Sequence, residues 1–134
     1  MTSAAAHLTL QSLIGSALGT GEWTTLNADH IQGFERAVGH TTQEVPLLLI
    51  LSLIPSLASS IDLPIPKPRM SMNYGLDTSR LLTGTKIGER VRARVSLLDV
   101  HQVGAGLQVK RQVLVENEAG DPVLEAETLT RLVW

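Results

Sequence analysis

VPLLLILSLIPSLA, residues 45 to 58, is the most apolar run of this 134-residue chain. The run is shorter than the roughly 20 apolar residues that a membrane-spanning helix needs. Pro46 stands where a proline costs least, at the start of a helix. Residues 47 to 57 are apolar almost all round, so a helix here must be covered on every side. In a chain of this length the natural cover is a curved sheet, so the run predicts a central helix wrapped by β-strands.

The sequence after this run has the pattern of strands. From residue 90 to residue 97 polar and apolar side chains alternate, which is typical of a strand with one buried face. Glycine-rich turns separate the later strands, which indicates an antiparallel meander. Helices followed by strands predict a domain of the α+β class. The strands expected from this reasoning cover residues 70 to 76, 90 to 100, 107 to 116 and 123 to 133.

Two helical segments are predicted before the apolar run. The first has apolar residues at helical spacing from Leu10 to Ala17 and ends before Gly19. The second begins after Asn27, a residue that caps helices well, and ends at Gly39. Both precede the central helix in a single domain that we expect to span residues 1 to 134.

The composition excludes several classes of protein. The chain has no cysteine, so disulfides, thiolate metal sites and a cysteine nucleophile are excluded. Its formal net charge is -2 without a long basic run, so no nucleic-acid partner is expected. The histidines do not form a pair at metal-binding spacing, and we expect neither a metal nor another cofactor. The N-terminus lacks the basic start of a signal peptide, so we expect a cytoplasmic protein without a membrane partner.

Several stretches resemble the MaoC-like dehydratases and nodulation protein N. GEWTTLNADHIQGFERAVG, residues 21 to 39, resembles the family's first strand and helix, and LLILSLIPSL, residues 48 to 57, resembles its central helix. NYGLDTSRLL, residues 73 to 82, resembles the family's N-Y-G-x-[DN]-x-x-R-F stretch. The remaining sequence resembles the closing strands. The resemblance covers nearly the whole chain and implies a hotdog fold, an antiparallel β-sheet wrapped around a central hydrophobic helix.

The family is associated with reversible hydration of trans-2-enoyl thioesters carried on coenzyme A or an acyl carrier protein. In its T-G-D-x-[NQ]-x-x-H signature the Asp and His activate a water, and N–H groups of the central helix polarise the thioester carbonyl. The resemblance implies substrate-binding positions at Gln43, Asn73, Tyr74, Gly75 and Arg80. The structural alternative gives Gly75 to a β-bulge or to a close approach of another chain segment, and makes Arg80 an ion-pair partner.

The chain departs from this signature. His40 stands at the Asp position, Thr42 at the [NQ] position and Val45 at the His position, and the loop before the central helix is missing. His40 with Glu44 is the candidate for a replacement base that a carboxylate orients. The alternative is a helix-end histidine that favours the negative end of the dipole, with Gln43 and Glu44 in a solvated loop.

Other polar residues have simpler interpretations. Ser52 lies in the apolar helix without the surroundings of a nucleophile, so its hydroxyl is expected to bond back to the preceding turn. Arg90, Arg92 and Arg94 line one face of a strand. They are expected on an exposed, charged face, with binding to coenzyme A phosphates or to an acyl carrier protein as the alternative.

Three functions remain open. The first is a hotdog protein that binds acyl thioesters or similar apolar ligands, related to hydratases and dehydratases but with a degenerate Asp/His dyad. The second is a non-catalytic subunit that pairs with an active hotdog partner. The third is a thioesterase or repurposed enzyme that uses His40 and Glu44. A homodimer or a heterodimer is expected, because an open sheet edge otherwise invites uncontrolled pairing.

Overall fold

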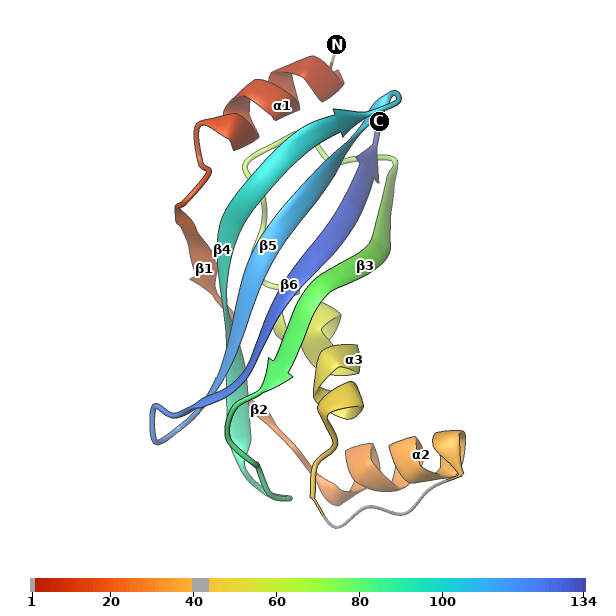
Figure 1. The fold of residues 1–134 in the computed structure, drawn as a ribbon, viewed down its shortest axis with the longest axis vertical. Coiled ribbons are helices and arrows are strands. Elements are labelled where there is room, and N and C mark those ends of the chain that lie inside the picture. The colour runs from red at the N-terminus through yellow and green to blue at the C-terminus, as the bar shows by residue number, and fades with distance from the viewer. Residues whose placement is uncertain (1, 40–43) are drawn as a thin grey trace.

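The computed structural model describes residues 2–39 and 44–134 (Figure 1). The strands form one antiparallel sheet in the order β1-β4-β5-β6-β3, and β2 also pairs with β4. The α+β architecture expected from the sequence is therefore confirmed. The elements in chain order are α1 (Thr2–Gln11), β1 (Ala17–Thr20), β2 (Thr24–Thr25), α2 (Ala28–Val38), α3 (Leu47–Leu57), β3 (Met70–Leu81), β4 (Arg90–Val103), β5 (Gly106–Asn117) and β6 (Pro122–Val133).

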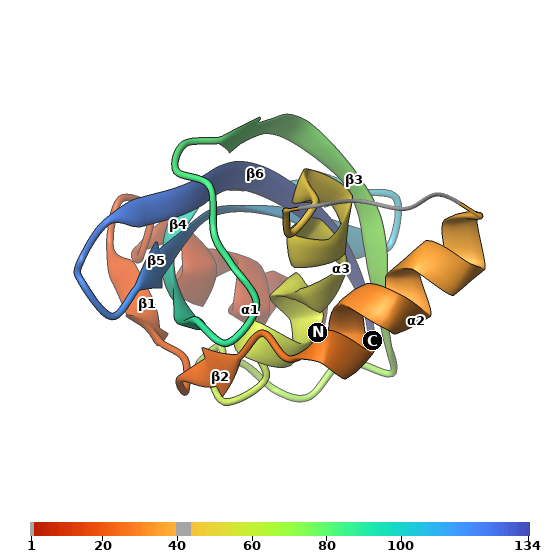
Figure 2. The ribbon, with the colours of Figure 1, turned by 90° about the horizontal axis from the view of Figure 1, so that it is seen from below.

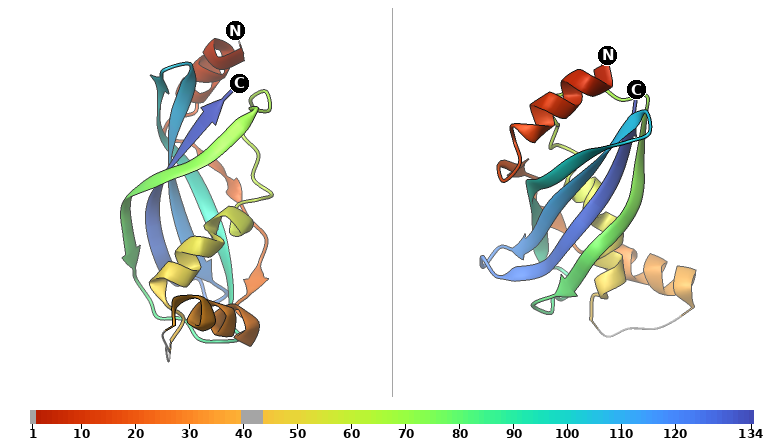
Figure 3. Two further views of the ribbon diagram at one scale, coloured as in Figure 1. Left: turned by 90° about the vertical axis from the view of Figure 1, so that its right-hand side faces the viewer. Right: turned by 45° about the horizontal axis from the view of Figure 1, so that its top comes forward.

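The apolar run forms α3, which lies against the concave face of the curved sheet (Figures 2 and 3). Ile50 and Ile54 of α3 pack into the core with Val91 and Val95, which face inward from β4. The predicted central helix and its wrapping sheet are confirmed. The arrangement follows from the sequence pattern, in which a helix that is apolar almost all round is followed by strands with one apolar face. Packing the helix against those faces removes both apolar surfaces from water.

The cover over α3 is incomplete within one chain. Leu48 is 63% exposed, although it lies in the most apolar segment of the sequence. The expectation that this helix is covered on every side is therefore wrong for the single chain. The sheet covers one side of α3 and α2 contacts it, while the Leu48 side chain stays exposed.

The strand predictions are confirmed with one extension. β4, β5 and β6 form the expected meander, and each begins or ends within a few residues of the predicted bounds. β3 continues to Leu81, well beyond the predicted end at Leu76. The extension follows from pairing, because Ser79 and Leu81 lie opposite Ala126 and Leu124 of β6.

The first helix lies earlier in the sequence than the apolar spacing predicts. α1 ends at Gln11, and Ala17 lies in β1, where it pairs with Ser96 of β4. Gly15 has a φ of 87°, which turns the chain out of the helical path. The apolar residues from Leu10 to Ala17 therefore belong to a helix, a turn and a strand, and the prediction of one helix is wrong.

The second helix has the caps that the sequence predicts. The Asn27 side chain accepts a hydrogen bond from the His30 backbone N–H at 3.0 Å, and His30 Nδ1 accepts one from the Asn27 N–H. Gly39 ends the helix with a φ of 69°. His30 is thus occupied in a capping box. Among residues 2–39 and 44–134, no helix is long and apolar enough to cross a membrane, and no cluster of side chains is suited to a metal ion.

Candidate functional site

A cavity of about 230 Å³ lies between α3 and the edge strand β3. Apolar side chains of the helix form one wall, and a bent stretch of β3 together with β6 forms the other. The cavity offers an apolar ligand a place beside the central helix, with a few polar groups within reach. Its lining residues are Leu51, Ile54, Pro55, Asn73, Tyr74, Gly75, Leu76, Thr128 and Leu129.

Three of the predicted substrate-binding residues, Asn73, Tyr74 and Gly75, lie together in this wall. The β3–β6 pairing shifts register between Asn73 and Gly75, so the strand bulges at this point. A Cβ at Gly75 would meet only Leu129 Cδ1, at 3.9 Å, which is an ordinary contact. The interpretation of Gly75 as part of a bulge is confirmed, and no close approach requires a glycine there.

The Tyr74 ring is held by a cation–π contact. The Arg131 guanidinium carbon lies 3.7 Å from the ring centroid, and Arg131 Nε donates to Gln108 Oε1 at 3.0 Å. The contact holds the ring beside Arg131 of β6. Asn73 has a different position, because it also lines a second cavity deeper under α3.

The later part of the stretch from residue 73 to residue 82, which includes Asp77 and Arg80, does not line the cavity. Arg80 forms an ion pair with Glu125 at 3.1 Å, as the structural alternative predicts. Lys110 Nζ lies 2.8 Å from Asp77 Oδ2, and this hydrogen bond is the main reason that the pKa of Lys110 is raised. Of the family-like stretch in β3, only the part around the bulge contributes to the cavity.

The stretch that corresponds to the catalytic signature is described only at its end. His40 and Gln43, two of the predicted site residues, lie outside the described residues. Glu44 lies beside Gly84, with its Oε2 3.5 Å from the position of an added Cβ. Val45 is 2% exposed and packs in the core with Leu49. The side chain at the signature's final position is thus part of the hydrophobic core.

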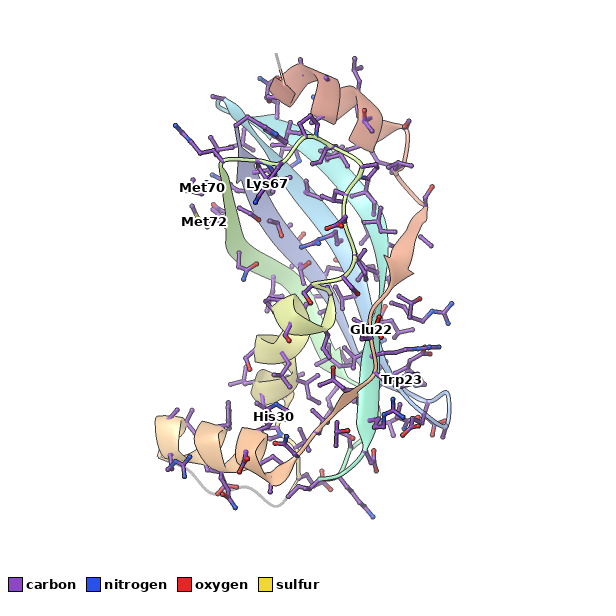
Figure 4. The ribbon with its side chains drawn as sticks, turned by 180° about the vertical axis from the view of Figure 1, so that it is seen from behind. Glu22, Trp23, His30, Lys67, Met70 and Met72 are labelled. Carbon is purple, nitrogen blue, oxygen red and sulfur yellow. The ribbon has the colours of Figure 1, made fainter. Side chains whose placement is uncertain are left out.

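The other polar residues behave as predicted. Ser52 Oγ donates a hydrogen bond to the Leu49 carbonyl oxygen at 2.6 Å, so this hydroxyl bonds back to the preceding turn. Arg92 pairs with Glu116 at 2.9 Å and lies 4.4 Å from the centroid of the Trp23 ring, and Trp23 lies beside β4 (Figure 4). Arg90 and Arg94 also pair with glutamates on this face. The exposed, charged face is confirmed.

Sequence analysis missed Thr128 and Arg111, which line the cavities under α3. A signal for Arg111 was present, because it occupies a position of β5 that alternation assigns to the apolar face. No such signal exists for Thr128, since threonine is common on either face of a strand.

Comparison with known proteins shows which proteins this chain is related to. No model of a protein family matches the chain. Nodulation protein N of Rhizobium leguminosarum bv. viciae is 33% identical over 140 residues, which cover 89% of this chain and 86% of the relative. The 3-hydroxyacyl-thioester dehydratase Z of Mycobacterium tuberculosis is 27% identical over 142 residues, with 92% and 93% of the two chains covered.

Solved structures share the fold at lower identity. The monoamine oxidase regulatory protein from Archaeoglobus fulgidus has a TM-score of 0.75 at 16% identity over 89% of both chains. A MaoC-like dehydratase from Rhodospirillum rubrum has a TM-score of 0.69 at 13% identity, with 90% of this chain and 92% of that chain covered. The ChsH1-ChsH2 complex from Mycobacterium tuberculosis has a TM-score of 0.65 at 12% identity, with 90% and 98% covered. With its hotdog fold and its 33% identity to nodulation protein N, the chain belongs to the MaoC-like dehydratase and nodulation protein N family.

Proposed function

We propose that the chain binds an acyl thioester of coenzyme A or of an acyl carrier protein, with the acyl group in the cavity between α3 and β3. The observation that carries the proposal is this apolar cavity of about 230 Å³, which the bulge around Asn73, Tyr74 and Gly75 borders. The relationship to a 3-hydroxyacyl-thioester dehydratase supports the same class of ligand. Leu51 and Ile54 offer the methylene groups of an acyl chain an apolar surface.

The same proposal includes loss of the usual Asp/His dyad. Val45 has no group that accepts or donates a proton, and its side chain is packed in the core with Leu49. A second general acid or base would have to come from elsewhere. We therefore propose a relative of hydratases and dehydratases whose main role is binding. A thioesterase or a repurposed enzyme that uses His40 and Glu44 is the alternative with chemistry of its own.

The proposal predicts that the acyl chain adds affinity. Hexanoyl-CoA is expected to bind at least about tenfold more tightly than free coenzyme A, because each buried methylene contributes about 0.8 kcal/mol. Leu51→Trp, which fills the cavity, should remove this difference, and Leu8→Trp on the exposed face of α1 should not. Isothermal titration calorimetry measures all of these affinities. Equal binding of the two ligands by the unaltered protein would refute the proposal.

A second proposal concerns subunit pairing. β3 is one of the edge strands of the sheet, and it is exposed along its whole length. Its large side chains Met72, Tyr74 and Leu76 are exposed, and so is Leu48 of α3. An exposed apolar edge strand pairs readily with another chain. We propose that a second hotdog subunit, identical or different, covers this edge, as the structural similarity to the ChsH1-ChsH2 complex supports.

In the identical case, the solution mass is expected to be twice the 14.4 kDa of one chain. Met72→Lys together with Leu76→Lys should shift the protein to the monomer, because two charges would be buried without partners at the joined edge. Light scattering after gel filtration measures the mass, and Leu8→Lys on α1 is the matched control. A single-chain mass for the unaltered protein at micromolar concentration would exclude the homodimer.

A further inference from the structure

Arg111 interrupts the apolar inner face of β5. Its neighbours along that face, Val109 and Val113, are almost completely buried, as are Leu107 and Val115 beyond them. A charged side chain at such a position is unusual, because charge that leaves water costs free energy unless a partner compensates it. The sequence places an arginine where alternation calls for a valine or a leucine, so a specific interaction is expected.

The Arg111 guanidinium has no acidic partner among residues 2–39 and 44–134. Its Nη2 donates a hydrogen bond to Thr130 Oγ1 at 3.1 Å, while its Nε is buried without a hydrogen-bond partner. Burial lowers the pKa of Arg111 from its usual value. Arg80 and Arg92, by contrast, each pair with a glutamate. The Arg111 guanidinium therefore keeps donors for an anion.

Thr128, the neighbour of Arg111 on β6, has a second buried polar atom without a partner. It lies directly opposite Arg111 in the β5–β6 pairing, and its Oγ1 is also buried without a partner. In the described part of the chain only His7 contains another such atom. Buried polar groups are almost always satisfied, so two unsatisfied atoms on neighbouring strands indicate groups that a ligand satisfies.

Both residues lie along a row of cavities. A cavity of about 180 Å³ beside Arg111 shares Ile54, Pro55 and Asn73 with the cavity at the β3 bulge. A wider cavity of about 600 Å³ also reaches Arg111, beneath the linker that carries Lys67 (Figure 4). Asp62 of that linker lines the wider cavity but does not pair with Arg111.

The row is short enough for one ligand to extend along it. The first cavity is lined by Leu51, and the second by Ala58 at the end of α3. Leu51 and Ala58 are seven positions apart along the helix, which corresponds to a rise of about 10 Å. A group held at the β3 bulge therefore has Arg111 within reach of a short acyl chain.

We propose that Arg111 binds a carboxylate at the far end of the acyl chain, so that the preferred ligand is the thioester of a dicarboxylic acid. This inference rests on the proposed thioester binding. The thioester lies at the β3 bulge, the methylene groups pass under Pro55, and the carboxylate meets the guanidinium with Thr128 beside it. A guanidinium binds a carboxylate through two parallel hydrogen bonds. The walls beside Arg111 include Ala58, Val95 and Val113, which suit methylene groups better than a coenzyme A phosphate.

Two thioesters of equal chain length test the inference. Adipyl-CoA and hexanoyl-CoA differ by the terminal carboxylate, and calorimetry gives the affinity of each. The unaltered protein is expected to bind adipyl-CoA roughly 10- to 100-fold more tightly, because hydrogen bonds to a charged group contribute this much. Arg111→Met, which keeps the length and removes the charge, should abolish the preference and leave hexanoyl-CoA binding unchanged. Arg94→Met, on the outer face of the sheet, is the matched control and should keep the preference.

Each other outcome contradicts the inference in a distinguishable way. Equal affinity of the unaltered protein for the two ligands overturns the role of Arg111 and leaves thioester binding intact. If neither ligand binds, both proposals are overturned. Equal weakening of the two ligands by Arg111→Met shows that the guanidinium recognises the coenzyme A phosphates instead. If Arg111→Met does not fold, Arg111→Lys and the comparison of the two ligands with the unaltered protein decide the question.

Discussion

Hydration of crotonyl-CoA by the purified protein is expected to be slower than by an ordinary hydratase by something like 10⁴-fold or more. A general acid and a general base each contribute about 10²- to 10⁴-fold to a rate. Val45 is a buried core residue, and His40 stands where the family has a carboxylate, with a different reach and charge. The loss of enoyl absorbance follows the reaction directly, with an active hotdog hydratase as the positive control. A turnover of about 10 s⁻¹, the median for enzymes, would show that the catalytic groups lie elsewhere.

The variant His40→Ala tests whether His40 contributes to any hydration activity that remains. We expect this variant to leave the slow rate unchanged and to cost a few tenths to about 1 kcal/mol of stability, the effect of a helix-end histidine. If His40 acts as a base, the variant's rate should fall by about 10²-fold, and the rate of the unaltered protein should depend on pH through protonation of the imidazole. Glu44→Gln should then shift the pH profile, because a carboxylate that orients the ring also stabilises its charged form.

Ile50→Ala is expected to lower the free energy of unfolding by about 2–5 kcal/mol. Ile50 is 0% exposed and lies in the core cluster of α3 and the sheet, so its removal leaves a cavity as well as a loss of apolar contact. The melting temperature should fall by about 10 °C, as circular dichroism at a fixed protein concentration measures.

Ile87→Ala is the matched control for this effect. The substitution is the same, but Ile87 is 55% exposed in the connection between β3 and β4. Surface substitutions usually change stability by less than about 0.5 kcal/mol. Similar losses in the two variants would mean that α3 is not the centre of the core.

The sequence predicts this fold well because its strongest patterns are local. The apolar run that forms α3 and the alternation in β4 each depend on a few neighbouring residues. The error at Ala17 has a physical reason as well. The apolar residues continue at helical spacing past the end of α1, and the turn at Gly15 separates that helix from β1.

The candidate site was less predictable, because it depends on register between distant strands. Asn73 and Gly75 were expected near the ligand from resemblance alone, and the structure places them in the wall of a cavity. Thr128 lies opposite Arg111 only because β5 and β6 pair in one register, which no local pattern encodes. Arg80 shares the same sequence stretch but lies beyond a second shift in register, where it pairs with Glu125.

The open edge of β3 has a consequence for how this protein tolerates dilution. One side of the strand pairs with β6, and the backbone groups on its other side have no strand beside them in the part of the chain that the structure describes. If a second subunit satisfies those groups, folding is linked to assembly by mass action, and stability rises with the concentration of the partner. Dilution then acts on this protein as a mild denaturant. The amount of partner that a cell makes then sets how much of the chain stays folded.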